Sequence, residues 1–355
     1  MNYLLVILIL ILGGIFFYIV QYKINLDKVK NLDTGNINIT ENKIKFSSLS
    51  LKQKIAQMIV IRGDKENLQF NNLAIGGIFL SKQESEEAYK ELIEKYQKNA
   101  KIKLFITTDM EGAWDPFSKD PHKSEKFPTF SEIKNSQEAY ETGMRQGELL
   151  KKLGFNLNFA PVSEFKDGIY GGRVFLGTKE EIKDKLEAYI NGLQKSAYGT
   201  CKHYPGKGMI GNTHLRRDKQ EITKEDIELF KTCLDKNISS VMIGHQIVYG
   251  EIDSGGEPSS ISKEVIAPLK EKDVLIVSDE VNMMGLRSFY LLKKEMYVDL
   301  INSGENVILD FSLNPASAHA LISGIEQKIK MGEISQEKID ESVKKILEMK
   351  GYKVV

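Results

Sequence analysis

Carboxylate, lysine and imidazole side chains recur directly after the apolar segments of this sequence. A carboxylate can act as a nucleophile, and an imidazole can give and take a proton near neutral pH. A polar residue where a strand meets water is common, but such groups following five separate segments indicate a functional pocket. These residues are Asp109, Glu111, Glu164, Lys202, His203, His245, Asp279 and Glu280.

Eight short apolar runs are predicted to be the strands that position these groups. They cover residues 55–61, 74–80, 103–109, 155–162, 199–205, 239–245, 274–280 and 306–311. The stretches between them carry helix-start signals at Ser81, Thr178 and Thr223, each with an acidic residue three positions on, and Gly154 and Gly199 mark helix ends. Alternating strands and helices predict parallel βα units, and the count of eight favours a (β/α)₈ TIM barrel. A last helix is expected within 332–352.

Composition and motifs exclude several classes of function. The 355 residues carry 49 basic and 49 acidic side chains, so there is no basic excess that would indicate nucleic acid as a partner. GKGMIG (206–211) satisfies a dinucleotide motif, but no helix pattern opens inside it. No zinc or Walker spacing is present, so neither a metal nor a nucleotide cofactor is predicted. Cys201 and Cys233 are either buried thiols or one disulfide.

Six motifs, in order, resemble glycoside hydrolase family 3, and most of all its single-barrel bacterial β-N-acetylglucosaminidases. Each motif is modest alone, but six in the family's order are specific, and they extend over nearly the whole domain. They are DMEGA (109–113), NLNFAPVSEF (156–165), GGRVFLG (171–177), KHYPGKG (202–208), VMIGH (241–245) and SDEVNMMGL (278–286).

The resemblance implies a retaining mechanism in which Asp279 is the nucleophile. It also implies that His214, on the loop after the fifth strand, is the general acid/base. Asn212 stands where the family usually has Asp; its side-chain oxygen could orient the imidazole but adds no charge, so slower turnover is expected. The alternatives are an Asp279 that caps a helix and a His214 that is a surface loop residue.

The remaining predicted site residues contact the sugar. The resemblance assigns hydrogen bonding to Asp109, Arg173, Lys202 and His203, and His245 belongs to the same substrate-binding set, while Trp114 could stack on a sugar face. The implied substrate is a glycan ending in β-linked N-acetylglucosamine, with peptidoglycan fragments as the leading class. A glycan-binding barrel that has lost turnover and a β-glucosidase of the same family remain alternatives.

The amino terminus is predicted to be a membrane anchor. Residues 3–20 contain no charge and approach the ~20 apolar residues that span a bilayer, although a cleaved signal peptide is an alternative. The expected organisation is an anchor over 1–22, a polar linker over 23–47 and the barrel over 48–355. Lys23, Lys28 and Lys30 would favour the inside. A wall glycan would lie outside, so we expect an extracytoplasmic domain.

Overall fold

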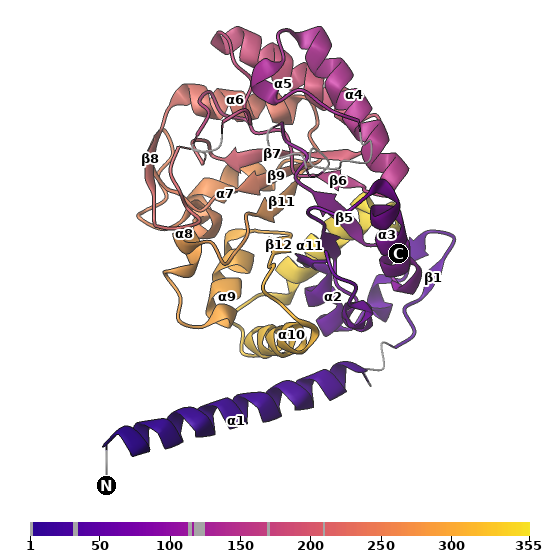
Figure 1. The fold of residues 1–355 in the computed structure, drawn as a ribbon, viewed down its shortest axis with the longest axis vertical. Helices are drawn as coiled ribbons and strands as arrows, with labels where there is room; N and C mark the ends of the chain where they lie inside the picture. Colours follow the sequence, from indigo (N-terminus) through magenta and orange to yellow (C-terminus); the bar gives the residue numbers. More distant parts are fainter. Residues whose placement is uncertain (1–2, 31–34, 113–115, 117–124, 169–170, 209) are drawn as a thin grey trace.

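The computed structural model describes the chain apart from residues 1–2, 31–34, 113–115, 117–124, 169–170 and 209 (Figure 1). Its centre is one sheet of eight parallel strands, in the spatial order β11-β9-β7-β6-β5-β4-β3-β12. The strands are β3 (Ile59–Arg62), β4 (Gly77–Phe79), β5 (Phe105–Thr108), β6 (Leu157–Asn158), β7 (Tyr198–Tyr204), β9 (Ser240–Ile243), β11 (Leu275–Ser278) and β12 (Ile308–Leu309).

The sheet closes almost completely into a barrel. From β3 to β11, each strand pairs with the next strand of this sheet along the chain, and β12 pairs with β3. A parallel bridge between Val277 and Val307, with the Ser278 amide 2.9 Å from the Val307 oxygen, joins β11 to the segment that leads into β12. All eight predicted strand positions contain a strand of this sheet, and the arrangement fits a TIM-like fold.

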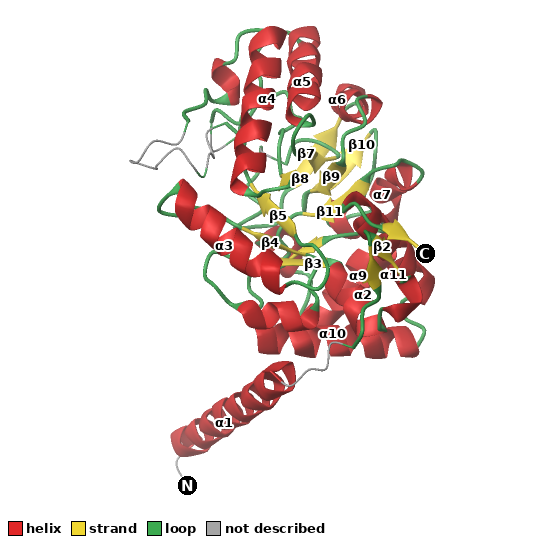
Figure 2. Ribbon diagram, turned by 90° about the vertical axis from the view of Figure 1, so that its right-hand side faces the viewer, coloured by secondary structure: helices red, strands yellow, loops and turns green. Residues whose placement is uncertain are grey.

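Helices surround the strands (Figure 2). They are α2 (Leu51–Gln57), α3 (Glu86–Asn99), α4 (Ser136–Leu153), α5 (Lys179–Leu193), α6 (Lys224–Asp235), α7 (Lys263–Lys270), α8 (Met284–Arg287), α9 (Lys293–Ser303), α10 (Pro315–Lys330) and α11 (Gln336–Met349). Thr178 and Thr223 form the predicted capping boxes at the starts of α5 and α6. Gly154 ends α4 with φ 97°, a conformation that favours glycine.

Three local predictions differ from the structure. Residues 55–57 belong to α2 rather than to the first strand, because Ser50 caps a short helix there. Helix α3 is capped by Ser85 and not by Ser81, whose hydroxyl instead lies 2.7 Å from Asp64 Oδ2. Gly199 lies within β7. Apolar runs and capping signals thus predicted where the helices and strands lie. Their exact ends differ because other side chains, such as Ser50 and Ser85, form the caps.

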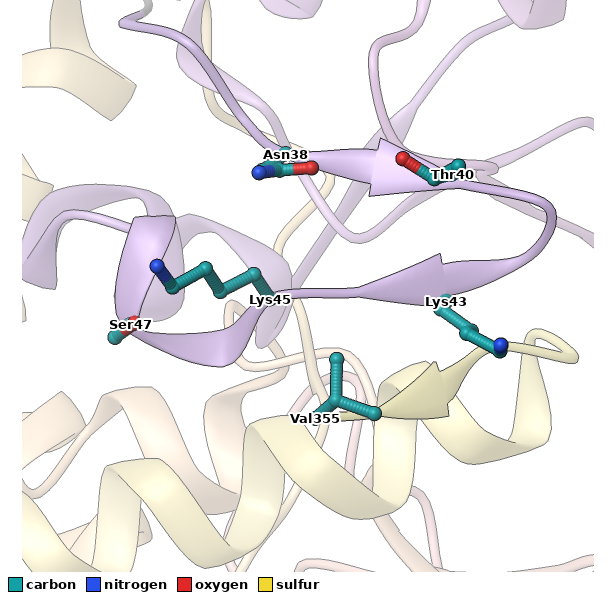
Figure 3. Close-up of a pocket in the computed structure, with 6 residues that line it drawn as sticks. All are labelled: Asn38, Thr40, Lys43, Lys45, Ser47 and Val355. Carbon is teal, nitrogen blue, oxygen red and sulfur yellow. The ribbon is translucent and has the colours of Figure 1, made fainter.

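Two smaller sheets flank the barrel. One contains β1 (Ile39–Thr40), β2 (Lys43–Ile44) and β13 (Lys353–Val354), and the Lys103 amide donates to the Tyr352 hydroxyl, which ties this sheet to the amino-terminal end of β5. A surface hollow on it is lined by Asn38, Thr40, Lys43, Lys45, Ser47 and Val355 (Figure 3). This hollow therefore lies at the end of the barrel opposite the polar strand-end residues. The other sheet pairs β8 (Lys219–Ile222) with β10 (Ile247–Gly250).

The predicted transmembrane anchor is wrong. In the described part of the chain, no helix combines the length and the apolar character needed to cross a bilayer. Helix α1 (Tyr3–Lys30) continues through the charged residues assigned to the linker, and its end packs on the protein, where Val29 is buried and its carbonyl accepts from Asn72 Nδ2 (Figure 1). The predictions of a membrane partner and of a membrane-anchored location, which depend on this anchor, are therefore wrong as well.

Cys201 on β7 and Cys233 on α6 form a disulfide, which decides between the two states that the sequence left open. Both cysteines are fully buried. The bond ties the strand that carries Lys202 and His203 to the helix packed outside it.

Candidate active site

The predicted site residues meet at the carboxyl ends of the barrel strands. Asp109 directly follows β5, Lys202 and His203 lie near the end of β7, and Asp279 directly follows β11. Parallel strands of a barrel all end at the same face, so these side chains come together although they are up to 170 residues apart in sequence.

A buried network of charges forms one half of this site. Lys202 Nζ lies 2.7 Å from Asp109 Oδ1 and 2.7 Å from Glu111 Oε2, and the Arg173 guanidinium lies 2.5 Å from Glu111 Oε1. Lys202, Glu111 and Arg173 are almost fully buried, whereas 37% of the Asp109 side chain is exposed. We therefore call these four residues the ion-pair cluster, with Asp109 as its solvent-facing member.

Opposing effects set the protonation of this cluster. Burial lowers the pKa of Lys202, but the charges of Asp109 and Glu111 outweigh it, so the net shift of its pKa is upward. The same holds for Arg173, where burial is opposed first by Glu111 and then by Asp109. Burial raises the pKa of Glu111 despite both cations. The two cations thus keep their charge and can donate hydrogen bonds to hydroxyl groups.

The main chain around Arg173 is fixed by two loops in close contact. The Asp167 carboxylate accepts from the amides of Gly172 and Arg173. Gly112 has φ 65°, and a Cβ there would lie 2.5 Å from the Gly172 oxygen and 2.7 Å from the Phe130 nitrogen. Only glycine lets the segment after Asp109 approach the segment before Arg173 this closely.

His203 is buried beside Glu164. Its Nδ1 lies 3.2 Å from Glu164 Oε1. Burial, followed by the charges of Lys202 and Arg173, lowers the pKa of His203 well below its usual range. A neutral ring that donates through Nδ1 to the carboxylate leaves Nε2 as an acceptor, complementary to the donors of Lys202 and Arg173.

Asp279 links the ion-pair cluster to the rest of the site. It is half-buried, its amide donates to the Ile243 carbonyl, and its Oδ1 accepts from the Glu280 amide at 2.7 Å. Asp279 follows β11 at the same end of the barrel as Asp109 and Lys202. Asp279 is therefore a positioned carboxylate with access to solvent.

His245 is buried against the segment that carries Asp279. It is buried, its Nε2 donates to the Glu280 carbonyl at 3.0 Å, and its Nδ1 accepts from Ser260 Oγ at 2.8 Å. Burial lowers the pKa of His245, in keeping with a neutral ring. With both nitrogens engaged, His245 braces the segment that carries Asp279.

A polar network next to Asp279 was missed by the sequence analysis. Glu280 accepts from the Asn282 amide at 3.0 Å and from the Phe311 amide at 3.2 Å. Asn282 Nδ2 lies 3.0 Å from Asp310 Oδ1, and Lys293 Nζ lies 2.8 Å from Asp310 Oδ2. Asp310 directly follows β12, so applying the strand-end rule to the eighth run would have found it.

The loop that carries Asn212 and His214 lies at the exposed edge of the site. His214 is exposed, and its carbonyl accepts from the Met284 amide, five residues after Asp279. Asn212 Oδ1 is buried and has no hydrogen-bond partner among the described residues, so it does not hold the His214 ring in this structure.

The remaining predictions concern Trp114 and metal ions. Trp114 lies outside the described residues. Within the described ranges, no group of three or more His, Cys, Asp or Glu side chains is placed to hold a metal ion.

Comparisons with known proteins identify the family. The profile described as "Glycosyl hydrolase family 3 N terminal domain" matches residues 50–349. The chain belongs to glycosyl hydrolase family 3. The predicted resemblance is confirmed, and the protein is a glycoside hydrolase.

Several family 3 proteins are similar to this enzyme over most of its length. "Beta-hexosaminidase LpqI" of Mycobacterium tuberculosis is 24% identical over 331 residues, which cover 85% of this chain and 83% of that protein. The solved structure of LpqI aligns with a TM-score of 0.76 at 21% identity, over 86% of this chain and 95% of the other. A β-N-acetylhexosaminidase from Beutenbergia cavernae aligns with a TM-score of 0.76 at 21% identity, over 85% of this chain and 99% of the other. At these identities, the structural likeness establishes the fold.

Proposed function

We propose that this family 3 enzyme releases terminal β-linked N-acetylglucosamine from glycans by a retaining mechanism, with peptidoglycan-type glycans as its substrate class. The observation that carries the mechanism is the position of Asp279. It is a half-buried carboxylate directly after β11, oriented by the Glu280 amide, at the same end of the barrel as Asp109 and Lys202. The sugar preference is supported by two of the similar proteins, LpqI and the Beutenbergia cavernae protein, which are named as hexosaminidases.

In the first step, the Asp279 carboxylate attacks the anomeric carbon and the glycosidic C–O bond breaks. The His214 imidazolium gives its proton to the departing oxygen. In the second step, neutral His214 takes a proton from water, the water oxygen attacks the same carbon, and the bond to Asp279 breaks. Two inversions give net retention of configuration.

The ion-pair cluster would bind the sugar that is attacked. Lys202 and Arg173 remain cationic donors, Asp109 is the exposed acceptor, and His203 offers a ring nitrogen as a further acceptor. Sugar hydroxyls both donate and accept, so this mixture suits them. His245 contributes indirectly, by holding the Glu280 carbonyl.

A chromogenic assay tests this function. We expect hydrolysis of 4-nitrophenyl N-acetyl-β-glucosaminide to exceed that of the matching β-glucoside, and to be lost in Asp279→Ala. Preference for the glucoside would favour a β-glucosidase. The unpartnered Oδ1 of Asn212 makes a third outcome worth measuring: sugar binding by calorimetry without turnover, which would indicate a glycan-binding barrel.

A further inference from the structure

The loop that carries His214 has a closed base. Gly211 lies so near Asp218 that a Cβ at Gly211 would fall 1.8 Å from Asp218 Oδ2. The Asp218 carbonyl accepts from the Ile247 amide at 2.8 Å, where β8 begins to pair with β10. The two ends of the loop, residues 211 and 218, therefore lie close together. Contacts at these ends alone do not determine which way the rest of the loop points.

The tip of this loop rests on the segment that follows Asp279. The Gly285 amide donates to the Thr213 carbonyl at 2.7 Å, and the Met284 amide donates to the His214 carbonyl at 3.3 Å. A Cβ at Gly285 would lie 3.0 Å from Thr213 Cβ and 3.1 Å from His245 Cβ, so glycine permits this approach. These main-chain contacts would form with almost any side chains on the loop.

Arg217 adds side-chain contacts between the loop and the same segment. Its Nε lies 2.8 Å from Ser288 Oγ, and its Nη2 lies 2.8 Å from the Ser288 carbonyl. Its guanidinium carbon lies 3.8 Å from the centre of the Phe289 ring, within range of a cation–π interaction. The planar guanidinium thus contacts two consecutive residues in a way that a lysine could not reproduce.

The surface that Arg217 contacts is itself anchored. The Tyr290 hydroxyl lies 2.6 Å from Asp299 Oδ2 on α9, and Arg287 donates to the Tyr290 carbonyl. Arg217 therefore connects the loop to a fixed part of the barrel. The neighbouring residue, Arg216, is exposed and has no side-chain contact of this kind in the described structure.

We propose that Arg217 is a positioning residue that holds the His214 loop over Asp279 by contacting Ser288 and Phe289. This inference rests on the proposed function, because it concerns the group assigned to proton transfer. In this proposal Arg217 acts through the loop, and it sets how often His214 is in place when the glycosidic bond breaks.

The test compares Arg217→Ala with Arg216→Ala, which removes the same side chain one position away. Two exposed hydrogen bonds and one cation–π contact are each weak, so their joint loss predicts a fall of about tenfold in kcat/KM for phenyl N-acetyl-β-glucosaminide. The 2,4-dinitrophenyl glycoside, whose leaving group needs no proton, should lose less than ~2-fold, since general-acid catalysis contributes little to its departure. Arg217→Lys should fall between Arg217→Ala and the parent.

A second readout does not depend on activity. Amide hydrogen exchange of residues 212–217 should accelerate in Arg217→Ala and stay unchanged in Arg216→Ala, with equal melting temperatures. Equal kinetics and equal exchange in the two variants would overturn the role of Arg217 and leave the proposed function standing. Faster exchange in a protein that hydrolyses neither glycoside would support the loop contact and contradict the proposed function.

Discussion

The two halves of the site are built in opposite ways. The ion-pair cluster lies on the barrel strands and the loops packed against them. Apart from Asp109 it is almost fully buried, and each cation is paired with a carboxylate. The His214 loop is exposed over residues 214–217, and two main-chain hydrogen bonds and the Arg217 side chain connect it to the segment after Asp279. In the proposed mechanism, sugar binding is therefore assigned to a buried framework, and proton transfer to a loop with fewer contacts.

The largest expected effect comes from breaking the buried half. Lys202→Met leaves Asp109 without its cation and leaves Glu111 paired with Arg173 alone. Removal of one member of a buried ion pair costs about 3–5 kcal/mol in the free energy of unfolding. Denaturant unfolding measures this loss. Lys179→Met, which removes a lysine from a surface pair with Glu225, is the control and should barely change stability. Equal losses would show that the cluster is not a stabilising framework.

Breaking the exposed half should affect catalysis without affecting stability. His214→Gln is expected to lower kcat/KM for the phenyl glycoside by ~10²–10⁴-fold, the range typical of general acid–base catalysis. Its melting temperature should match that of the parent, because the side chain is exposed. A large fall in melting temperature would instead indicate a structural role for His214.

The protonation of the buried half gives a pH dependence. His203 has a lower pKa in the folded than in the unfolded protein, so unfolded chains bind more protons below pH ~6.5 and stability is lost as pH falls through that range. We expect His203→Gln to reduce the stability loss between pH 7 and pH 5 by about 1–2 kcal/mol. Denaturant unfolding at both pH values measures this; an unchanged loss would mean that His203 is protonated in the folded protein.

The smallest expected effect concerns the pairing of Asn212 with His214 on the exposed loop. Asn212→Asp places a carboxylate near His214, which favours the imidazolium. We expect kcat/KM to rise a few-fold, by about 1 kcal/mol or less, or the pH optimum to move upward. A pH–rate profile of both proteins measures this. No change in rate or optimum would count against Asn212 and His214 acting together.

The sequence predicted the binding half better than the loop. Alternating apolar runs placed all eight strands, and residues at strand ends converge by geometry, so Asp109, Lys202 and Asp279 could be placed without coordinates. The hydrogen-bond and ion-pair partners that these groups find on other helices and loops could not be predicted in this way. The pairing of Arg173 with Glu111 depends on a loop contact through Gly112, and the engagement of both His245 nitrogens depends on Ser260 and Glu280.

The predictions that failed share a cause. Local composition suggested a membrane span over 3–20, but the full extent of α1 and its packing through Val29 are tertiary properties. The family resemblance implied that Asn212 orients His214, and this pairing stays a prediction, because the Asn212 Oδ1 is buried without a partner in the described structure. Spacing along a loop does not fix the directions of its side chains.

The most direct test of the central claim is to trap the glycosyl-enzyme intermediate. The protein would be incubated with a slow fluorosugar of the N-acetylglucosamine series, digested, and analysed by mass spectrometry. The account predicts a single adduct on the peptide that contains Asp279, absent from Asp279→Ala. An adduct on another carboxylate, in a protein that hydrolyses the chromogenic substrate, would contradict it.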